Sequence, residues 1–314
     1  MTRILTVTPN PALDQSTSTE AVADTSKLRC TAARFDPGGG GINVARVIHR
    51  LGGDCLALYP AGGASGQHLR RLLDAEGVPS RCVDIAGDTR ESFTVRERST
   101  GRDFRFVLPG PELAPPEWQA CLDAVEELAT PAGFVVSSGS LPPGAPADFH
   151  AQVAQRARAA GCRVAVDASG PPLAKALAAG VDLVKPSLRE LRELTGLPLG
   201  TDTERLEAAR AIVRDGRAGI VALSLGAQGA LLVAAGAEFR APPVKVEIAT
   251  TVGAGDSFLA GLIFGLARGE SLEETFRTGM AAGAAALLGL GTTLCRASDV
   301  LRLRDSVEIV RLPA

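Results

Sequence analysis

Residues 134–167 read F-V-V-S-S-G-S-L-P-P-G-A-P-A-D-F-H-A-Q-V-A-Q-R-A-R-A-A-G-C-R-V-A-V-D, and this stretch contains the repeating unit of the chain. A short apolar run at 134–137 is followed by a helical pattern at 148–160 and a second apolar run at 164–167. Both runs are nearly continuous rather than alternating, which is typical of strands buried on both faces of a parallel sheet. The stretch therefore predicts a strand, a helix and a second strand.

The same alternation continues along nearly the whole chain. Further strands are predicted at 4–8, 55–59, 183–184 and 220–224, and further helices at 42–51, 67–76, 116–128 and 204–215. This order predicts an α/β fold with a doubly wound, mostly parallel sheet. We expect a single domain over residues 1–314, because no linker, internal repeat or low-complexity tract divides the sequence.

One region does not follow this alternation of strands and helices. Residues 92–98 (S-F-T-V-R-E-R) and 102–107 (R-D-F-R-F-V) alternate apolar and polar side chains around Ser99-Thr100-Gly101. That pattern predicts a β-hairpin. Residues 14–35 also lack helical periodicity and are rich in Thr, Ser and β-branched residues. We expect the segments at about 15–35 and 88–108 to form a small β-sheet that stands off the main body as a lid.

The composition of the 314 residues excludes several classes of protein. Hydrophobic residues make up 46% and charged residues 22%, and 33 Lys and Arg nearly balance 35 Asp and Glu. These values are ordinary for a globular protein, and the near-neutral charge argues against a nucleic-acid partner. The uncharged stretches 218–237 and 278–295 are interrupted by a turn or rich in Ala and Gly. We therefore expect neither a signal peptide nor a membrane span.

The cysteines and histidines carry no metal pattern. Six scattered cysteines without a C-x-x-C pair predict free thiols in a reducing, cytoplasmic location. The three histidines, His49, His68 and His150, are far apart on helical segments. We expect them at surface or half-buried positions, without a catalytic role.

The first chemical motif is D-P-G-G-G-G-I-N-V-A-R, from Asp36 to Arg46. Four consecutive glycines cost backbone entropy, so we expect them to let a ligand approach the main chain closely. Gly41 lies near a helix start, where free N–H groups and the helix dipole favour an anion. A flexible loop is the alternative, which is weakened because a helix with Asn43 in its first turn follows directly. The motif matches neither G-x-G-x-x-G nor the Walker pattern.

The second motif, T-T-V-G-A-G-D-S-F from Thr250 to Phe258, opens an apolar helix at 258–267. Its small residues bring backbone N–H groups to a helix N-terminus, and Asp256 lies in the same turn. Asp256 could be a plain N-cap. A turn that binds phosphate beside a carboxylate also suits a kinase, in which the carboxylate accepts a hydroxyl proton. The turn alone does not decide between these interpretations.

Two further motifs follow predicted strands. L-V-K-P-S-L-R-E at 183–190 places Lys185, one of only four lysines, at the C-terminal end of a strand. Ligands of α/β sheets bind at that edge. S-L-G-A-Q-G, from Ser224 to Gly229, is by itself best interpreted as a hairpin turn between Val221 and Val233.

Together these segments resemble the PfkB (ribokinase-like) sugar kinases. The resemblance rests on T-P-N-P-A-L-D at 8–14, G-G-G-G-I-N-V-A-R at 38–46, S-G-S-L-P-P-G at 138–144 and T-V-G-A-G-D-S around Asp256. Within the family, K-L-R-C-T-A at 27–32 and Gly40 are most similar to the 6-phosphofructokinase branch. The 1-phosphofructokinase and tagatose-6-phosphate kinase branches, which usually read G-G-K-G, remain the alternatives, because Gly40 is one residue.

The resemblance implies ATP-dependent phosphorylation of the C1 hydroxyl of fructose 6-phosphate. Asp256 would be the general base, and the amides of Gly253, Ala254 and Gly255 would hold the γ-phosphoryl group. Sugar hydroxyls would be bound by Asp14, Gly39 and Asn43. Arg and Lys bind phosphate through charge-assisted hydrogen bonds, and the candidate ligands of the sugar phosphate group are Lys27, Arg29, Arg90, Arg105 and Ser140.

The resemblance also implies cofactors and a partner. ATP would be faced by Lys185, Ser187, Ser224, Gly226 and Gly229. Glu190 would organise Mg²⁺ through water. Relatives usually read K-P-N-x-x-E where this chain has K-P-S-L-R-E, so Ser187 replaces an Asn. The property that this replacement would affect is the affinity for Mg²⁺. A monovalent cation such as K⁺ would be bound by carbonyl groups near Thr250, Val252, Ala286, Gly289 and Gly291.

The lid sheet would pair with a second subunit to give a homodimer, because the apolar face of its hairpin needs to be covered. An alternative from another class is a nucleotide-binding regulator without kinase activity. The pairing of a carboxylate with two separate anion-binding glycine turns argues against that class.

Overall fold

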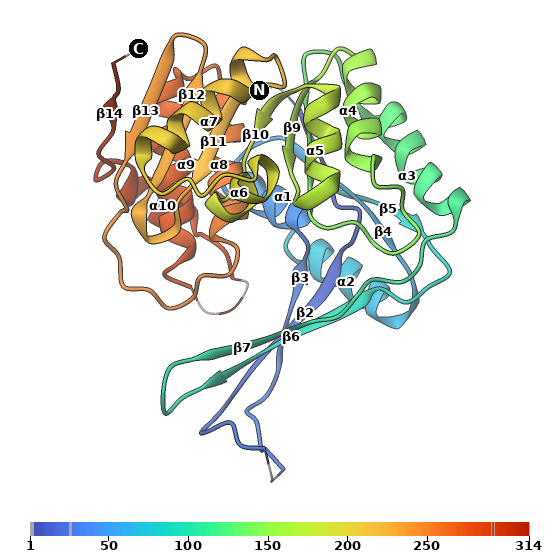
Figure 1. The fold of residues 1–314 in the computed structure, drawn as a ribbon. Helices are drawn as coiled ribbons and strands as arrows, with labels where there is room; N and C mark the ends of the chain where they lie inside the picture. The colour runs from blue at the N-terminus through green and yellow to red at the C-terminus, as the bar shows by residue number, and fades with distance from the viewer. Residues whose placement is uncertain (1–2, 25–26, 290, 292, 314) are drawn as a thin grey trace.

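A large central sheet carries the fold (Figure 1). The computed structural model describes residues 3–24, 27–289, 291 and 293–313. Within these residues, ten strands lie in the order β14-β13-β12-β11-β10-β9-β8-β1-β4-β5. The strands are β1 (Ile4–Val7), β4 (Cys55–Ala61), β5 (Ser80–Asp84), β8 (Phe134–Ser138), β9 (Arg163–Asp167), β10 (Val181–Val184), β11 (Ala218–Ser224), β12 (Ala230–Ala234), β13 (Ala237–Ala241) and β14 (Val310–Arg311).

Neighbouring strands from β5 through β1 to β11 are parallel, whereas β12, β13 and β14 add an antiparallel edge. The predicted mostly parallel sheet is confirmed. The hairpin expected between Val221 and Val233 is also present, because these two residues are partners in the β11–β12 ladder.

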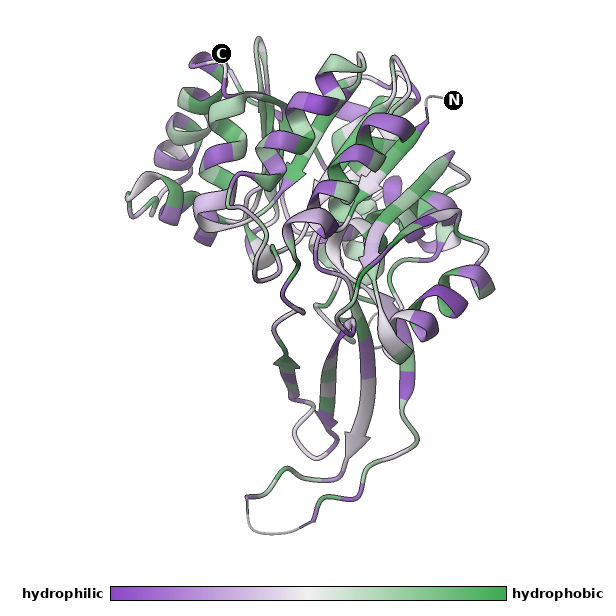
Figure 2. Cartoon of the chain, turned by 90° about the vertical axis from the view of Figure 1, so that its right-hand side faces the viewer, coloured by the Kyte–Doolittle hydropathy of each residue, from purple (hydrophilic) through white to green (hydrophobic). Residues whose placement is uncertain are grey.

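Helices cover both faces of this sheet. One face packs against α1 (Gly40–Arg50), α2 (Gly63–Ala75), α8 (Ala254–Ala267), α9 (Leu272–Ala286) and α10 (Ala297–Arg304). The other packs against α3 (Pro115–Leu128), α4 (Phe149–Ala159), α5 (Gly170–Ala179), α6 (Leu188–Thr195) and α7 (Asp202–Arg214). Successive residues of β8 therefore enter different cores, Phe134 and Val136 on one side and Val135 on the other. Burial on both faces explains the continuous apolar runs of the sequence, which colour the strands green in Figure 2.

A second, four-stranded sheet projects from the body (Figures 1 and 2). Its order is β3-β2-β6-β7, with β2 (Ala12–Thr19), β3 (Arg34–Gly38), β6 (Arg90–Glu97) and β7 (Asp103–Val107). The predicted lid and its β6–β7 hairpin are thus present. Two details differ from the sequence interpretation, because Asp14 lies within lid strand β2 and residues 36–38 belong to β3 rather than to a loop.

Three other expectations can be compared with the fold. All six cysteines are free thiols, and Cys30 on the lid is the exposed one. His150 is fully buried, so the surface or half-buried position expected for it is wrong. The described residues contain no helix that is long and apolar enough to cross a membrane.

Candidate active site

A cleft with a volume of about 440 Å³ lies where the C-terminal ends of the parallel strands meet the lid. Such a volume suits a small-molecule ligand. Most of the predicted site residues line it together: Asp14, Gly39, Asn43, Arg90, Arg105, Ser140, Lys185, Ser187, Glu190, Ser224, Val252, Gly253, Gly255 and Asp256.

The other predicted residues lie outside the lining of the cleft. Lys27 and Arg29 are exposed on the lid, Ala254 begins α8, and Gly226 and Gly229 flank the β11–β12 turn. The residues predicted for the monovalent cation lie in two segments, one before α8 and one at and after the end of α9. Thr250 and Ala286 are buried, Gly289 lines a separate cavity with Arg50, and Gly291 shares a small pocket under the lid with Val252.

The four-glycine turn leads into α1 beside the end of β1. Gly39 has a φ of 115°, which favours glycine. A Cβ atom at Gly41 would lie 2.5 Å from Thr8 Oγ1 and 2.7 Å from the Val7 carbonyl oxygen. These contacts are with the protein itself, so the sequence expectation that all four glycines serve ligand approach is too broad. Among the four, Gly39 and Gly40 line the cleft.

Asp256 connects the two glycine turns. Asn43 Nδ2 of α1 donates a hydrogen bond of 2.8 Å to Asp256 Oδ2. Helix α8 has Gly253 as its N-cap, at a φ of 75°, and no side chain caps the helix. Asp256 is therefore not the N-cap that the alternative interpretation assumed. Burial raises the pKa of Asp256, and the neighbouring Asn43, Lys185 and Arg105 act in the opposite direction.

A buried ion pair lies beside this turn. Lys185 Nζ is 3.2 Å from Asp167 Oδ1, and it is 3.6 Å from the position that a Cβ atom on Gly255 would occupy. Burial raises the pKa of Asp167 to about 6, which Lys185 partly opposes. Burial acts to lower the pKa of Lys185, but the carboxylates around it outweigh burial and raise it. Lys185 therefore carries its positive charge beside the helix N-terminus.

Sequence reasoning missed Asp167, although V-A-V-D at a strand end contained the necessary signal. It also missed a second role for Ser187 and Glu190. These residues form a capping box on α6, in which Ser187 Oγ accepts from the Glu190 amide and Glu190 Oε2 accepts from the Ser187 amide at 2.8 Å. The spacing S-x-x-E predicts that arrangement. Ser187 therefore also has a structural role, as the N-cap of α6.

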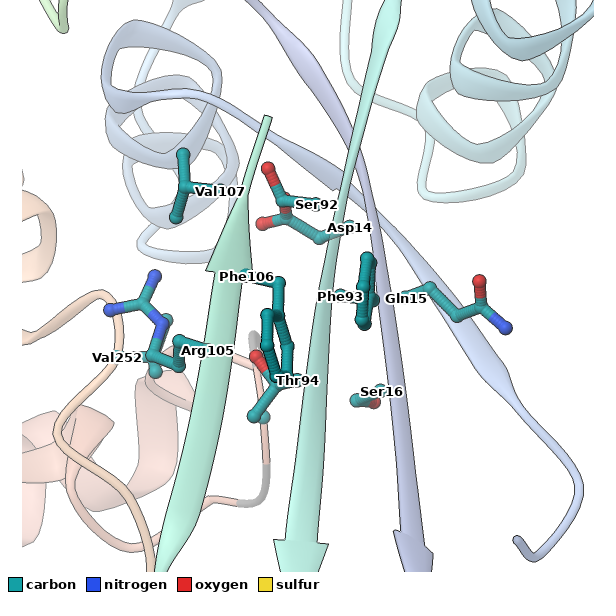
Figure 3. Close-up of a pocket in the computed structure, with 11 residues that line it drawn as sticks. Asp14, Gln15, Ser16, Ser92, Phe93, Thr94, Arg105, Phe106, Val107 and Val252 are labelled. Carbon is teal, nitrogen blue, oxygen red and sulfur yellow. The ribbon is translucent and has the colours of Figure 1, made fainter. Parts of the chain in front are cut away.

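The lid supplies the opposite wall of the cleft. Asp14 and Ser92 are partners on adjacent strands, and Figure 3 shows their side chains together. Arg105 shares the same small pocket with Val252 (Figure 3). Burial raises the pKa of Asp14 to about 6, although Arg105 and Arg90 favour its charged form. The lid wall thus combines a carboxylate with two cations.

Neighbouring side chains hold these groups in place. Arg90 donates hydrogen bonds to the carbonyl oxygens of Asn10 and Pro11, and Asn10 Nδ2 donates to Ser140 Oγ at 3.3 Å. Arg46 of α1 is almost fully buried and donates to the Pro37 carbonyl oxygen at 2.9 Å. It thereby fixes the end of β3 against the helix that carries Asn43. Both residues lie in the motifs at 8–14 and 36–46, but no sequence pattern indicated that they support the site. The partner of Asn10 is 130 positions away, whereas that of Arg46 is only nine positions away.

The cleft therefore offers a base between two helix N-termini, with cations on both walls. The family description "pfkB family carbohydrate kinase" matches residues 10–299, which is most of the chain. The chain belongs to the PfkB family of carbohydrate kinases. As a PfkB kinase it is an ATP-dependent sugar phosphotransferase, and the predicted ribokinase-like fold is confirmed.

Two curated PfkB relatives are similar over nearly the whole chain. Both are named ATP-dependent 6-phosphofructokinase isozyme 2. The protein from Mycobacterium tuberculosis is 50% identical, with 96% of this chain and 88% of the relative covered. The protein from Escherichia coli is 43% identical, with 96% and 98% covered.

Phosphofructokinase-2 from E. coli in complex with potassium has a TM-score of 0.94 to this chain, at 43% identity, with 98% and 99% of the two chains covered. Other structures of that protein are a crystal structure in complex with fructose-6-phosphate and a structure of a tetrameric inhibited form.

Proposed function

We propose that this kinase is an ATP-dependent 6-phosphofructokinase, which converts fructose 6-phosphate to fructose 1,6-bisphosphate. The observation that carries the proposal is the 2.8 Å hydrogen bond between Asn43 and Asp256, which joins the two glycine turns inside one cleft. The names of the relatives at 43–50% identity support the substrate. The E. coli protein crystallised with fructose-6-phosphate supports it further.

In the proposed reaction, Asp256 accepts the proton of the C1 hydroxyl while that oxygen attacks the γ-phosphorus of ATP and ADP leaves. Asn43 occupies Oδ2 of Asp256, so Oδ1 takes the proton. Burial raises the pKa of Asp256, which makes its carboxylate a stronger base. The amides of Gly253, Ala254 and Gly255 and the ammonium group of Lys185 stabilise the charge of the phosphoryl oxygens.

The sugar phosphate lies between the lid and the glycine turn in this proposal. Asp14, Gly39 and Asn43 bind hydroxyl groups, and Arg90, Arg105 and Ser140 bind the phosphate. These residues all line the cleft. Lys27 and Arg29 do not line the cleft. We therefore propose them as phosphate ligands only in the dimer.

The donor set fits a magnesium ion that is held mainly through nucleotide phosphates and water. Mg²⁺ prefers oxygen ligands and often uses one or two carboxylates. Asp167 and Glu190 provide such groups beside Lys185, and the described residues contain no cluster of three ligands that would hold a metal alone. When bound, Mg²⁺ would neutralise charge on the transferred phosphate.

We also propose that a monovalent cation binds to carbonyl groups near Thr250, Val252, Ala286, Gly289 and Gly291. The amides of Ala249 and Thr250 both donate to the Leu287 carbonyl oxygen, which brings the segment before α8 next to the segment after α9. The E. coli structure with potassium supports the choice of K⁺.

We further propose a homodimer that forms through the lid. The rings of Phe93 and Phe106 stack with centroids 4.7 Å apart, and 37% and 47% of these residues are exposed. Val22 and Leu28 add exposed apolar groups to the lid. A second copy would cover this surface. We also propose that residues 1–314 act as one domain in the cytoplasm.

A coupled assay of ADP release tests the substrate. The panel contains fructose 6-phosphate, fructose 1-phosphate, tagatose 6-phosphate and unphosphorylated fructose. We expect the highest kcat/KM for fructose 6-phosphate. Preference for fructose 1-phosphate would replace the proposal with the 1-phosphofructokinase activity named for a Rhodobacter capsulatus relative at 36% identity. If the protein bound nucleotide but consumed no ATP with any of these sugars, the result would instead indicate a nucleotide-binding regulator without kinase activity.

A further inference from the structure

Ser138, at the end of β8, has a buried hydroxyl group that the proposed mechanism does not use. The residue is 1% exposed. Its Oγ atom has no hydrogen-bond partner within the part of the chain that the structure describes. Leaving a hydroxyl group buried and unpaired is costly. Buried polar groups normally have a partner, so this hydroxyl is a candidate for contact with a ligand.

The orientation of Ser138 is set by the alternation of β8. Ser137 faces α4, where its Oγ lies 2.7 Å from Nδ1 of His150. His150 Nε2 lies 3.2 Å from the Gly139 carbonyl oxygen, which can only accept a hydrogen bond. Since Nε2 must carry the proton, Nδ1 accepts from the Ser137 hydroxyl, and burial lowers the pKa of His150 to about 4 so that the ring stays neutral. The side chain of Ser138 therefore points to the opposite face.

On that face Ser138 meets the cleft. It is the ladder partner of Asp167 and lines the same cleft as Asn43 and Asp256. A Cβ atom on Gly40 would lie only 2.3 Å from Ser138 Oγ. The hydroxyl is thus directed into the space that Gly40 leaves by having no side chain, above the turn that would bind the sugar phosphate.

We propose that Ser138 is a further substrate-binding residue, whose hydroxyl donates a hydrogen bond to an oxygen of the sugar phosphate above Gly40. The inference rests on the proposed function. A phosphate oxygen and a sugar hydroxyl offer the same acceptor chemistry, and a comparison of phosphorylated with unphosphorylated substrate distinguishes them. The proposed contact also requires a glycine at position 40, because any side chain there would displace the Ser138 hydroxyl.

The test measures KM for fructose 6-phosphate and for ATP, together with the melting temperature, in Ser138→Ala and Ser138→Cys. Loss of the hydrogen bond raises the sugar phosphate KM by about 3- to 10-fold where the acceptor is a sugar hydroxyl, and by about 10- to 100-fold where it is an anionic phosphate oxygen. Cys is nearly the same size and only a weak donor, so its KM follows that of the Ala variant. The KM for ATP stays unchanged, and the melting temperature of the Ala variant stays level or rises, because an unpaired buried hydroxyl is removed.

Thr6→Val is the matched control. Thr6 Oγ1 is also buried without a partner among the described residues, but Thr6 is not in the lining of the cleft. The control therefore leaves both KM values unchanged. A raised KM in Ser138→Ala for fructose 6-phosphate but not for fructose assigns the contact to the phosphate, whereas an equal rise for both assigns it to a sugar hydroxyl.

Two results would overturn the inference. One is a wild-type sugar phosphate KM in Ser138→Ala, and the other is a change confined to the KM for ATP. Failure of the proposed function looks different, because the unaltered protein would then not phosphorylate fructose 6-phosphate at all. As a second measurement, Gly40→Ala should raise the sugar phosphate KM more in the wild-type background than in Ser138→Ala, since both changes remove the same contact.

Discussion

The two sheets of this kinase build different halves of one site. The large sheet is buried on both faces, and its strand ends carry Lys185 and Asp167 next to the helix that bears Asp256. The lid sheet has one face on the cleft, with Asp14, Ser92 and Arg105, and places Phe93 and Phe106 on the other. The large sheet thus carries the groups that we assign to phosphoryl transfer, whereas the exposed lid carries groups that we assign to sugar phosphate recognition. We therefore expect substitutions in the first to lower kcat and substitutions in the second to raise KM.

The largest expected effect is that of Asp256→Asn in the large-sheet half. Loss of the general base should lower kcat by about 10²- to 10⁴-fold, while nucleotide binding measured by calorimetry stays near wild type. Asp74→Asn, on the exposed surface of α2, is the control and should retain full turnover. A variant at Asp256 that turns over at the normal rate would remove the assigned base.

In the lid half, Arg105→Ala should raise the KM for fructose 6-phosphate by about 10- to 100-fold, because a charge-assisted hydrogen bond to phosphate is lost. Steady-state kinetics should show an unchanged KM for ATP. Arg98→Ala alters a lid cation that pairs with Glu20 rather than lining the cleft. If both arginine variants weakened substrate binding equally, the lid wall would have no special role.

A pH series tests Asp14, whose pKa burial raises to about 6. Below that pH the carboxyl group binds a proton and becomes a weaker, uncharged acceptor of hydrogen bonds from sugar hydroxyls. The KM advantage of the wild type over Asp14→Asn should therefore be full above pH 7 and shrink by about tenfold at pH 5. Taking the ratio of the two variants cancels the titration of the substrate phosphate, and a ratio that does not change with pH would contradict the assignment.

The smallest effect concerns the outer face of the lid. Phe106→Ala should weaken the proposed dimer by about 3- to 10-fold, because it removes apolar surface that the second copy would cover. Analytical ultracentrifugation over a dilution series measures this change. Leu301→Ala replaces another exposed apolar residue, on α10, and should leave the dimer constant unaltered. A wild-type protein that is monomeric at all concentrations would exclude the lid dimer.

The sequence predicted the elements of the large sheet well where one physical signal dominated. Runs such as 134–137 are apolar because both of their faces are buried, and the periodicity of α3 and α7 is helical because one side of each helix packs on the sheet. The antiparallel edge from β12 to β14 was predicted only at its first turn. Its strands pair through contacts between residues such as Phe239 and Arg311, which local patterns do not record.

In the candidate site, too, local patterns indicated some residues, and only the tertiary structure identified others. The glycine turns and Asp256 stand out in the sequence, since consecutive small residues before a helix cost backbone entropy and free the helix N–H groups for an anion. Asn10, Arg46 and His150 did not stand out, because each acts through a partner that is defined only in space. The burial of His150 was mispredicted for this reason, and the capping role of Ser187 was overlooked although its spacing was visible.

By itself, the sequence determined the α/β class, the lid hairpin and the two glycine-rich turns before helices, because hydrophobic periodicity and glycine placement are local properties. The tertiary structure decided which groups meet. It alone brought Asn43 to Asp256 across 213 positions, set Lys185 against Asp167, and left Ser138 without a partner over Gly40 among the residues that the structure describes. Hydrogen bonds and ion pairs act over a few ångströms, so a chain order that separates their partners cannot reveal them.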